Sequence, residues 1–200
     1  VLVTARIVGA DYGAGAIDDV WVDRGESFIS DGAASQGRPT AVLEQKFADY
    51  YGLPETGTVE LAGGLVVEYT GVGVAPEEFY VVGPEGSILA EADLATLHMA
   101  TPTAQSLAGH EGEGNDLVIG LAPGADRDLV EAELATTFAP VASATVTTRD
   151  EAEAYRVLYE DIENDAQVWN ALSALVLGAA ALASFNLISR IVESQRREIG

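Results

Sequence analysis

Residues 171–188 read Ala171-Leu-Ser-Ala-Leu-Val-Leu-Gly-Ala-Ala-Ala-Leu-Ala-Ser-Phe-Asn-Leu-Ile188 and are apolar on every face of a helix. They lie within 24 consecutive uncharged residues, 166–189, and a helix of that length spans about 36 Å. A hydrocarbon core is about 30 Å thick, and an amphipathic core helix would carry a polar stripe that this stretch lacks. The stretch therefore predicts a membrane-spanning helix over 167–190 rather than the buried central helix of a soluble domain, the alternative structure with such a composition.

Charged residues are distributed unequally on the two sides of this span. Residues 1–165 hold 30 acidic and 7 basic side chains, a net charge of −23, whereas residues 166–200 hold 3 basic and 2 acidic ones. Arg190, Arg196 and Arg197 follow the span, and Trp169 stands at its other boundary. Because basic residues favour the cytoplasmic side, we expect residues 1–166 to be extracytoplasmic, the span to cross the plasma or inner membrane, and 191–200 to begin a cytoplasmic segment.

The span also contains small residues four positions apart, which allow membrane helices to approach closely. These candidate packing residues are Ala174, Gly178, Ala179 and Ala183. Alanine-rich spans also produce such pairs by composition alone, so the pattern is compatible with partner helices without requiring them.

A helix is predicted directly before the span, from Asp150 to Asn164, because this stretch has good helix formers and neither Gly nor Pro. Apolar residues recur along it with heptad-like spacing. The seam consists of Tyr155, Leu158, Ile162 and Trp169. It fits either a domain helix packed on its own core or a stalk, residues 149–166, that pairs with another helix and transmits motion.

The remaining residues, 1–148, predict an α+β domain with a mixed or antiparallel sheet and helices on one face. Runs rich in Val, Ile, Tyr and Phe between turn residues predict strands at 1–9, 19–22, 58–61, 65–74, 79–82 and 116–121. Gly63-Gly64 predicts a hairpin turn between two of them. Helices are predicted at 40–51, 92–99 and 126–138 from their apolar spacing and their terminal residues.

Composition excludes several classes of function. The chain has 32 acidic and 10 basic residues, a net charge of −22, so it would repel nucleic acid. It has no cysteine, and its two histidines, His98 and His110, accompany no Gly-x-Ser-x-Gly motif, so no catalytic residue is predicted. No cofactor or metal is expected: the acidic loop 109–116 lacks EF-hand spacing, and the adjacent Glu77 and Glu78 are interpreted as surface charge.

The end of the chain, Ile188-Ser-Arg-Ile-Val-Glu-Ser-Gln-Arg-Arg-Glu-Ile-Gly200, resembles the cytoplasmic exit of the second membrane helix of FtsX/MacB-like ABC transporter permeases. The segments 39–52, 57–61, 69–80 and 115–119 are similar to the extracytoplasmic core domain of that family. Ser194 and Gln195 depart from its pattern, which has charged residues there. Family members carry further membrane helices on both sides, so we expect this chain to be a fragment.

The resemblance implies a permease subunit that couples ATP hydrolysis on a separate ABC ATPase to export or mechanotransmission, with no enzymatic activity of its own. It implies a homodimer or paired permease in membrane lipid, with a lipid, peptide or lipoprotein as cargo. The candidate ATPase-proximal residues are Arg190, Arg196, Arg197 and Glu198. The alternative hypothesis is a single-pass anchored binding module, in which the span is only a tether.

Overall fold

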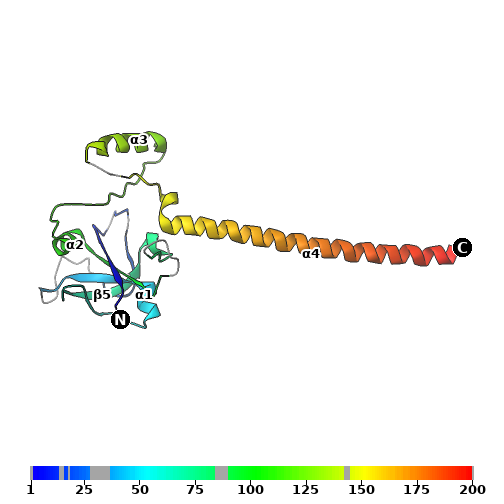
Figure 1. Ribbon diagram of the computed structural model, residues 1–200, viewed down its shortest axis with the longest axis horizontal. Helices are drawn as coiled ribbons and strands as arrows, with labels where there is room; N and C mark the ends of the chain where they lie inside the picture. Colours follow the sequence, from blue (N-terminus) through cyan, green and yellow to red (C-terminus); the bar gives the residue numbers. More distant parts are fainter. Residues whose placement is uncertain are drawn as a thin grey trace. The chain divides into compact units, whose positions relative to one another are not determined.

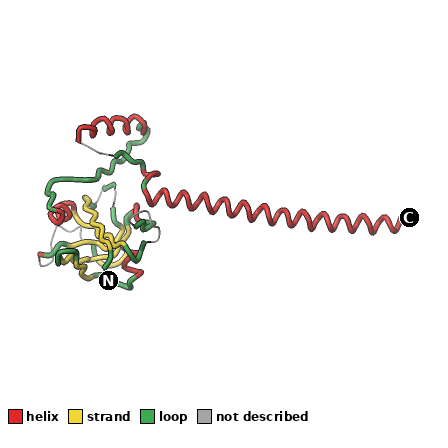
Figure 2. Tube along the Cα trace, viewed as in Figure 1, coloured by secondary structure: helices red, strands yellow, loops and turns green. Residues whose placement is uncertain are grey.

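The computed structural model describes residues 2–13, 16–17, 19–27, 37–83, 90–141 and 145–199 (Figures 1 and 2). The chain divides into two units, Val1–Tyr155 and Arg156–Gly200. The first unit contains a mixed sheet with helices, and the second consists of a long apolar helix that begins in the first unit. The predicted fold class, α+β followed by a long stalk and transmembrane-type helix, is confirmed.

The sheet has six strands in the order β1-β6-β3-β5-β2, with β4 paired to β5. The pairs β1/β6 and β3/β5 are parallel, whereas β3/β6, β2/β5 and β4/β5 are antiparallel, so the sheet is mixed. The strands are β1 (Thr4–Ala10), β2 (Trp21–Gly25), β3 (Thr40–Glu44), β4 (Gly57–Glu60), β5 (Val66–Val74) and β6 (Leu94–Ala100). This order places β3 and β6 in the interior of the sheet.

Within the described residues, four α-helices and three short 3₁₀ turns with bounds accompany the sheet. The helices are α1 (Gln45–Tyr50), α2 (Thr101–Ala108), α3 (Arg127–Phe138) and α4 (Glu153–Ile199), and the 3₁₀ turns are η2 (Pro76–Glu78), η4 (Ala139–Val141) and η5 (Arg149–Glu151). Both α1 and α2 pack against the same face of the sheet, since Phe47 of α1 and Leu107 of α2 join one apolar cluster. A Cβ at Gly9 would collide with that of Ala104, so glycine lets α2 lie close to β1.

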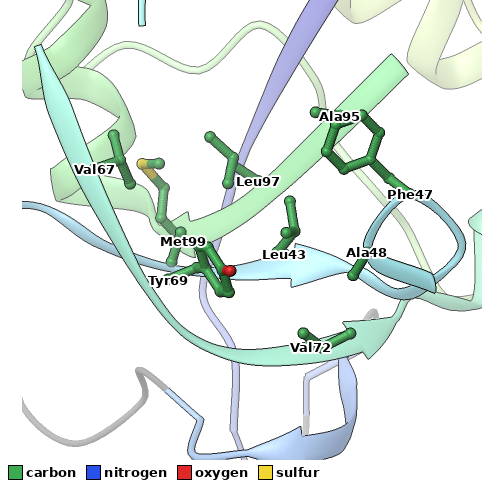
Figure 3. Close-up of a cluster of buried hydrophobic side chains, with 10 residues drawn as sticks. Leu43, Phe47, Ala48, Val67, Tyr69, Val72, Ala95, Leu97 and Met99 are labelled. Atoms are coloured by element: carbon green, nitrogen blue, oxygen red, sulfur yellow. The ribbon is translucent and has the colours of Figure 1, made fainter. Parts of the chain in front are cut away.

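The main core lies between these helices and the sheet. Figure 3 shows its side chains converging from β3, α1, β5 and β6. The buried members are Ala41, Leu43, Phe47, Ala48, Val67, Tyr69, Val72, Ala95, Leu97 and Met99. Because the side chains of a strand alternate between its two faces, the remaining residues of β3 and β6 point to the opposite face.

Several predicted elements are confirmed with small shifts of their ends. The predicted strands at 1–9, 19–22, 58–61 and 65–74 correspond to β1, β2, β4 and β5, although Val1 itself lies outside the described residues. Gly63 and Gly64 form the turn between β4 and β5, with φ angles of 90° and 82° that favour glycine. The helix predicted at 126–138 is α3, whose first turn is capped by the Asp126 carboxylate, 3.2 Å from the Leu129 amide.

The helix predicted at 40–51 is wrong over its first half. Residues 40–44 are strand β3, and only Gln45–Tyr50 are helical. Ala41, Val42 and Leu43 are all completely buried, because β3 is covered on both faces. A strand buried on both faces has a continuous apolar sequence without alternation, which short segments share with buried helices.

The helix predicted at 92–99 is also wrong, for the same reason. This stretch is strand β6, with every residue from Leu94 to Met99 buried. The helix that follows it, α2, was not predicted from the sequence. Pro102 lies in its first turn. The C-cap residue Gly109 has a left-handed φ of 71°, so the sequence contains a signal for each end of the helix.

Two predicted strands do not join the sheet. Residues 79–82 follow the 3₁₀ turn η2 and contribute a single bridge at Val82. Residues 116–121 are irregular and, among the described residues, form no strand pairing. Apolar composition predicted both as strands, but strand formation also requires a neighbouring strand whose backbone groups are unpaired.

The helix α4 continues without interruption from Glu153 to Ile199 and includes the whole predicted span. Its length and composition qualify it to cross a membrane, and none of its most apolar stretch is buried within the protein. The exposure of these apolar side chains is compatible with a lipid environment.

Candidate functional site

The sheet face opposite the main core carries a cluster of buried polar side chains. It is defined here as Tyr12, Glu44, Glu78 and His98. Strands β3 and β6 position two of its members, because Val42 pairs with His98 in the antiparallel register and Glu44 follows on the same face of β3. Glu44, Glu78 and His98 are only 1%, 8% and 2% exposed.

Each polar atom of His98 has a partner. The ring atom Nε2 lies 2.8 Å from the Glu78 carboxylate, and Nδ1 lies 3.2 Å from the Tyr12 hydroxyl. A proton on Nε2 satisfies both contacts, because Nε2–H donates to the carboxylate and Nδ1 accepts from the hydroxyl. The Tyr12 ring also meets the imidazole edge to face, with centroids 6.3 Å apart.

Glu44 connects the sheet to helix α1. Its carboxylate accepts hydrogen bonds from the backbone amides of Lys46 at 2.8 Å and Phe47 at 2.7 Å, so it is the N-cap of the helix. Burial nevertheless raises the pKa of Glu44 above its ordinary value of 4.5, and the negative charge of Glu78 acts in the same direction. The two amide bonds and the Lys46 charge oppose this shift without cancelling it.

The segment after η2 is attached to this cluster. The Lys46 ammonium donates to the carbonyl oxygen of Phe79 and lies 5.5 Å from the centroid of the Tyr80 ring. The Phe79 ring in turn contacts Tyr155, with centroids 5.0 Å apart and an interplanar angle of 76°. The buried cluster is therefore connected by direct contacts to the first turn of α4.

The cluster includes residues that the sequence analysis did not identify as functional. The interpretation of Glu78 as surface charge is wrong, since η2 turns its carboxylate into the interior. The sequence did contain one signal: His98 and Thr96 alternate with Leu97 and Met99, which indicates a strand with a polar and an apolar face. His98 is too buried to meet a substrate, so the arrangement is suited to holding segments together rather than to acid–base catalysis.

The predicted site residues outside the cluster all lie on α4. The candidate seam residues Leu158, Ile162 and Trp169 follow Tyr155 on one face of this helix, and the last two are 55% and 64% exposed. With about 100° per residue, Ala179 and Ala183 lie within about a quarter turn of that face, whereas Ala174 and Gly178 lie near the opposite one. Helix α4 therefore has small residues on two sides.

The candidate ATPase-proximal residues occupy the last two and a half turns of the same helix. Arg190 and Arg196 are exposed. Arg197 and Glu198 belong to α4 by their backbone. The structure thus places the four charges on a continuous helix, as a short basic segment after the apolar stretch.

The acidic loop 109–116 is exposed. His110 Nδ1 lies 2.9 Å from the Glu113 carboxylate, and both side chains are more than half exposed. Within the described parts of the chain, no group of three or more His, Asp or Glu side chains is arranged to hold a metal ion.

An open hollow of about 1100 Å³ lies between α3 and the flanking segments 114–121 and 145–150. Apolar side chains line much of it, namely Leu117, Ile119, Leu121, Val130, Leu134 and Phe138. Arg127 and Asp150, 3.4 Å apart, are polar members of the same lining.

Comparison of the chain with models of protein families, with curated proteins and with solved structures finds no match.

Removal of the Glu78 carboxylate is expected to destabilise the domain. Glu78→Ala leaves the buried His98 N–H without an acceptor, which should lower the free energy of unfolding by about 1–3 kcal/mol. Glu78→Gln keeps an acceptor and should cost less. Glu55→Ala, at an exposed loop position, is the control and should change the free energy by less than about 1 kcal/mol. Chemical denaturation followed by circular dichroism measures these values, and equal effects of Glu55→Ala and Glu78→Ala would contradict the buried pair.

The raised pKa of Glu44 predicts a specific pH dependence. The folded state retains the Glu44 proton to higher pH than the unfolded state, so the contribution of Glu44 to stability falls as pH rises from about 4.5 through the higher folded-state pKa. The difference in free energy of unfolding between the natural protein and Glu44→Gln should therefore shrink, or turn against the natural protein, over this window. Denaturation at a series of pH values measures it, with Glu60→Gln on the exposed strand β4 as control. A difference that grows with pH would contradict the raised pKa of Glu44.

Proposed function

We propose that this chain is part of the permease subunit of an FtsX/MacB-type ABC transporter, in which a separate cytoplasmic ATPase drives export or mechanotransmission by an extracytoplasmic domain. The continuity of α4 is the observation that carries the proposal. One helix begins within the folded unit that ends at Tyr155, contains the 24 uncharged residues and ends in the basic segment. A tether requires only an apolar span, whereas transmission of motion requires an uninterrupted helix from the domain to the cytoplasmic end.

The distribution of charge supports the proposed orientation. Residues 1–165 have a net charge of −23, and three arginines follow the span. The positive-inside rule then assigns residues 1–166 to the extracytoplasmic side of the plasma or inner membrane and 191–200 to the cytoplasm. There Arg190, Arg196, Arg197 and Glu198 would lead into the segment that contacts the ATPase.

Small residues on two sides of α4 support partner helices in the membrane. Ala179 and Ala183 would pack one neighbour, and Ala174 and Gly178 another, as expected for a permease that pairs with a second copy or with a related subunit. The exposed seam of Leu158, Ile162 and Trp169 offers a contact for a second stalk. In this proposal the domain acts on a lipid, peptide or lipoprotein, and ATP is hydrolysed elsewhere.

The proposed orientation predicts the labelling of single cysteines, which the absence of natural cysteine makes straightforward. Glu55→Cys lies on an exposed loop of the domain, and Ser194→Cys lies beyond the span. In intact cells a membrane-impermeant maleimide should label Glu55→Cys, and Ser194→Cys should react only after permeabilisation. The opposite pattern would refute the orientation, and labelling of both in intact cells would refute the span.

The proposed coupling predicts an effect of charge reversal at the cytoplasmic end. In lipid nanodiscs the full-length protein should bind and stimulate the ABC ATPase encoded beside it. Arg196→Glu/Arg197→Glu should weaken binding at least about tenfold, because each charged contact contributes about 1.5–3 kcal/mol. Arg196→Lys/Arg197→Lys keeps the charge and should retain more binding, and Arg156→Glu, before the span, should leave it unchanged.

The same experiment separates the two functional hypotheses. Association with the ATPase that depends on Arg196 and Arg197 supports the permease. Absence of any association, with and without nucleotide, would refute it and favour the anchored binding module.

A further inference from the structure

We infer that residues 76–82, named here the joint segment, are the attachment through which the sheet holds the first turn of α4. This inference deepens the proposed function and rests on it, because a helix that transmits motion needs a fixed connection to the domain that it moves. Neither Glu78 nor Phe79 is assigned any role by the function proposed above.

Four consecutive residues of the joint segment contact strand β6, helix α1 or the residues that precede β6. Glu78 pairs with buried His98 at 2.8 Å, and the carbonyl oxygen of Phe79 accepts from Lys46. The Tyr80 ring lies 5.5 Å from the Lys46 ammonium, and the carbonyl oxygen of Val81 accepts from the Ala90 amide at 3.2 Å. A buried hydrogen bond between an imidazole N–H and a carboxylate is costly to break, so the backbone of this segment has little freedom to move away from the sheet.

Phe79 connects the joint segment to α4. Its backbone is fixed by Lys46, and its ring contacts Tyr155 at 5.0 Å. The Arg149 guanidinium lies 5.3 Å from the centroid of the same Tyr155 ring, and Ala154 is only 6% exposed. Within the described residues, an aromatic pair and the buried methyl group of Ala154 attach the first turn of α4 to the domain.

A cavity beside this contact provides space for the first turn to move. It has a volume of about 150 Å³ and is lined by Arg6, Glu78, Tyr80, Thr96 and Ala154 among others. The open space beside Ala154 leaves this side of the first turn without packed atoms, so fewer contacts oppose its displacement. The geometry thus combines a strongly fixed joint segment with a weakly held first turn, as an articulated connection requires.

Hydrogen exchange of the full-length protein in nanodiscs tests the inference. The amides of residues 157–160 close the first turn of α4 by bonding to carbonyls four residues earlier. Phe79→Leu and Tyr155→Leu should each accelerate their exchange by about 3- to 10-fold. The double variant should exchange no faster than the faster single variant, because both substitutions remove the same contact. Glu78→Gln should accelerate exchange at residues 78–81 as well as at 157–160.

Phe47→Leu is the matched control, since it removes a buried phenylalanine from the opposite face of the sheet. It should leave exchange at 157–160 at the natural rate. ATPase stimulation is measured on the same samples and should fall in Phe79→Leu and Tyr155→Leu but not in Phe47→Leu.

The two readouts separate failure of the inference from failure of the proposed function. If the natural protein stimulates the ATPase, and exchange and stimulation are both unchanged in Phe79→Leu, then the inference about the joint segment is wrong. The permease proposal is unaffected by that result. If the natural protein does not stimulate the ATPase, the permease proposal is wrong. Accelerated exchange in both single variants would then support the joint segment as the attachment of a tethered domain.

Discussion

Burial of β3 and β6 on both faces is the constraint from which the rest of the domain follows. One face of this strand pair contributes Leu43 and Leu97 to the apolar core. The other face contributes Glu44 and His98, and buried polar groups must be paired to avoid a large cost in free energy. Glu44 meets that requirement by capping α1, and His98 meets it by binding Glu78, so the polar face determines where α1 begins and where the joint segment lies.

Pairing of Glu78 with His98 fixes the joint segment more firmly than the first turn of α4 is fixed. The joint segment is fixed by buried hydrogen bonds, whereas the first turn of the helix is held by the ring contact between Phe79 and Tyr155 beside a cavity. Because α4 continues from this turn through its apolar stretch without a break, a displacement of the helix would act first on that contact. In the proposed permease this is where movement driven by the ATPase would reach the domain.

Prediction from the sequence succeeded for the strands with exposed residues, for helix α3 and for β5, which follows the glycine turn at Gly63 and Gly64, and it missed α2. The strands β1, β2, β4 and β5 and the helix α3 were predicted within a few residues. It failed for β3 and β6, because a continuous apolar run such as Ala41 to Leu43 is compatible with a buried strand or a helix. The helical placement of the candidate residues on α4 was predictable, whereas burial of Glu78 depends on the fold of a segment distant from His98 in sequence.

The sequence alone determined the long apolar helix, the acidic character of the domain and the α+β class, because each depends on local composition and periodicity. Tertiary structure decided which apolar runs became central strands, since strand pairing depends on backbone partners far along the chain. It also decided the role of Glu44, Glu78 and His98. A carboxylate is a surface charge in water and a structural bond in the interior, and only the fold determines which of these environments it occupies.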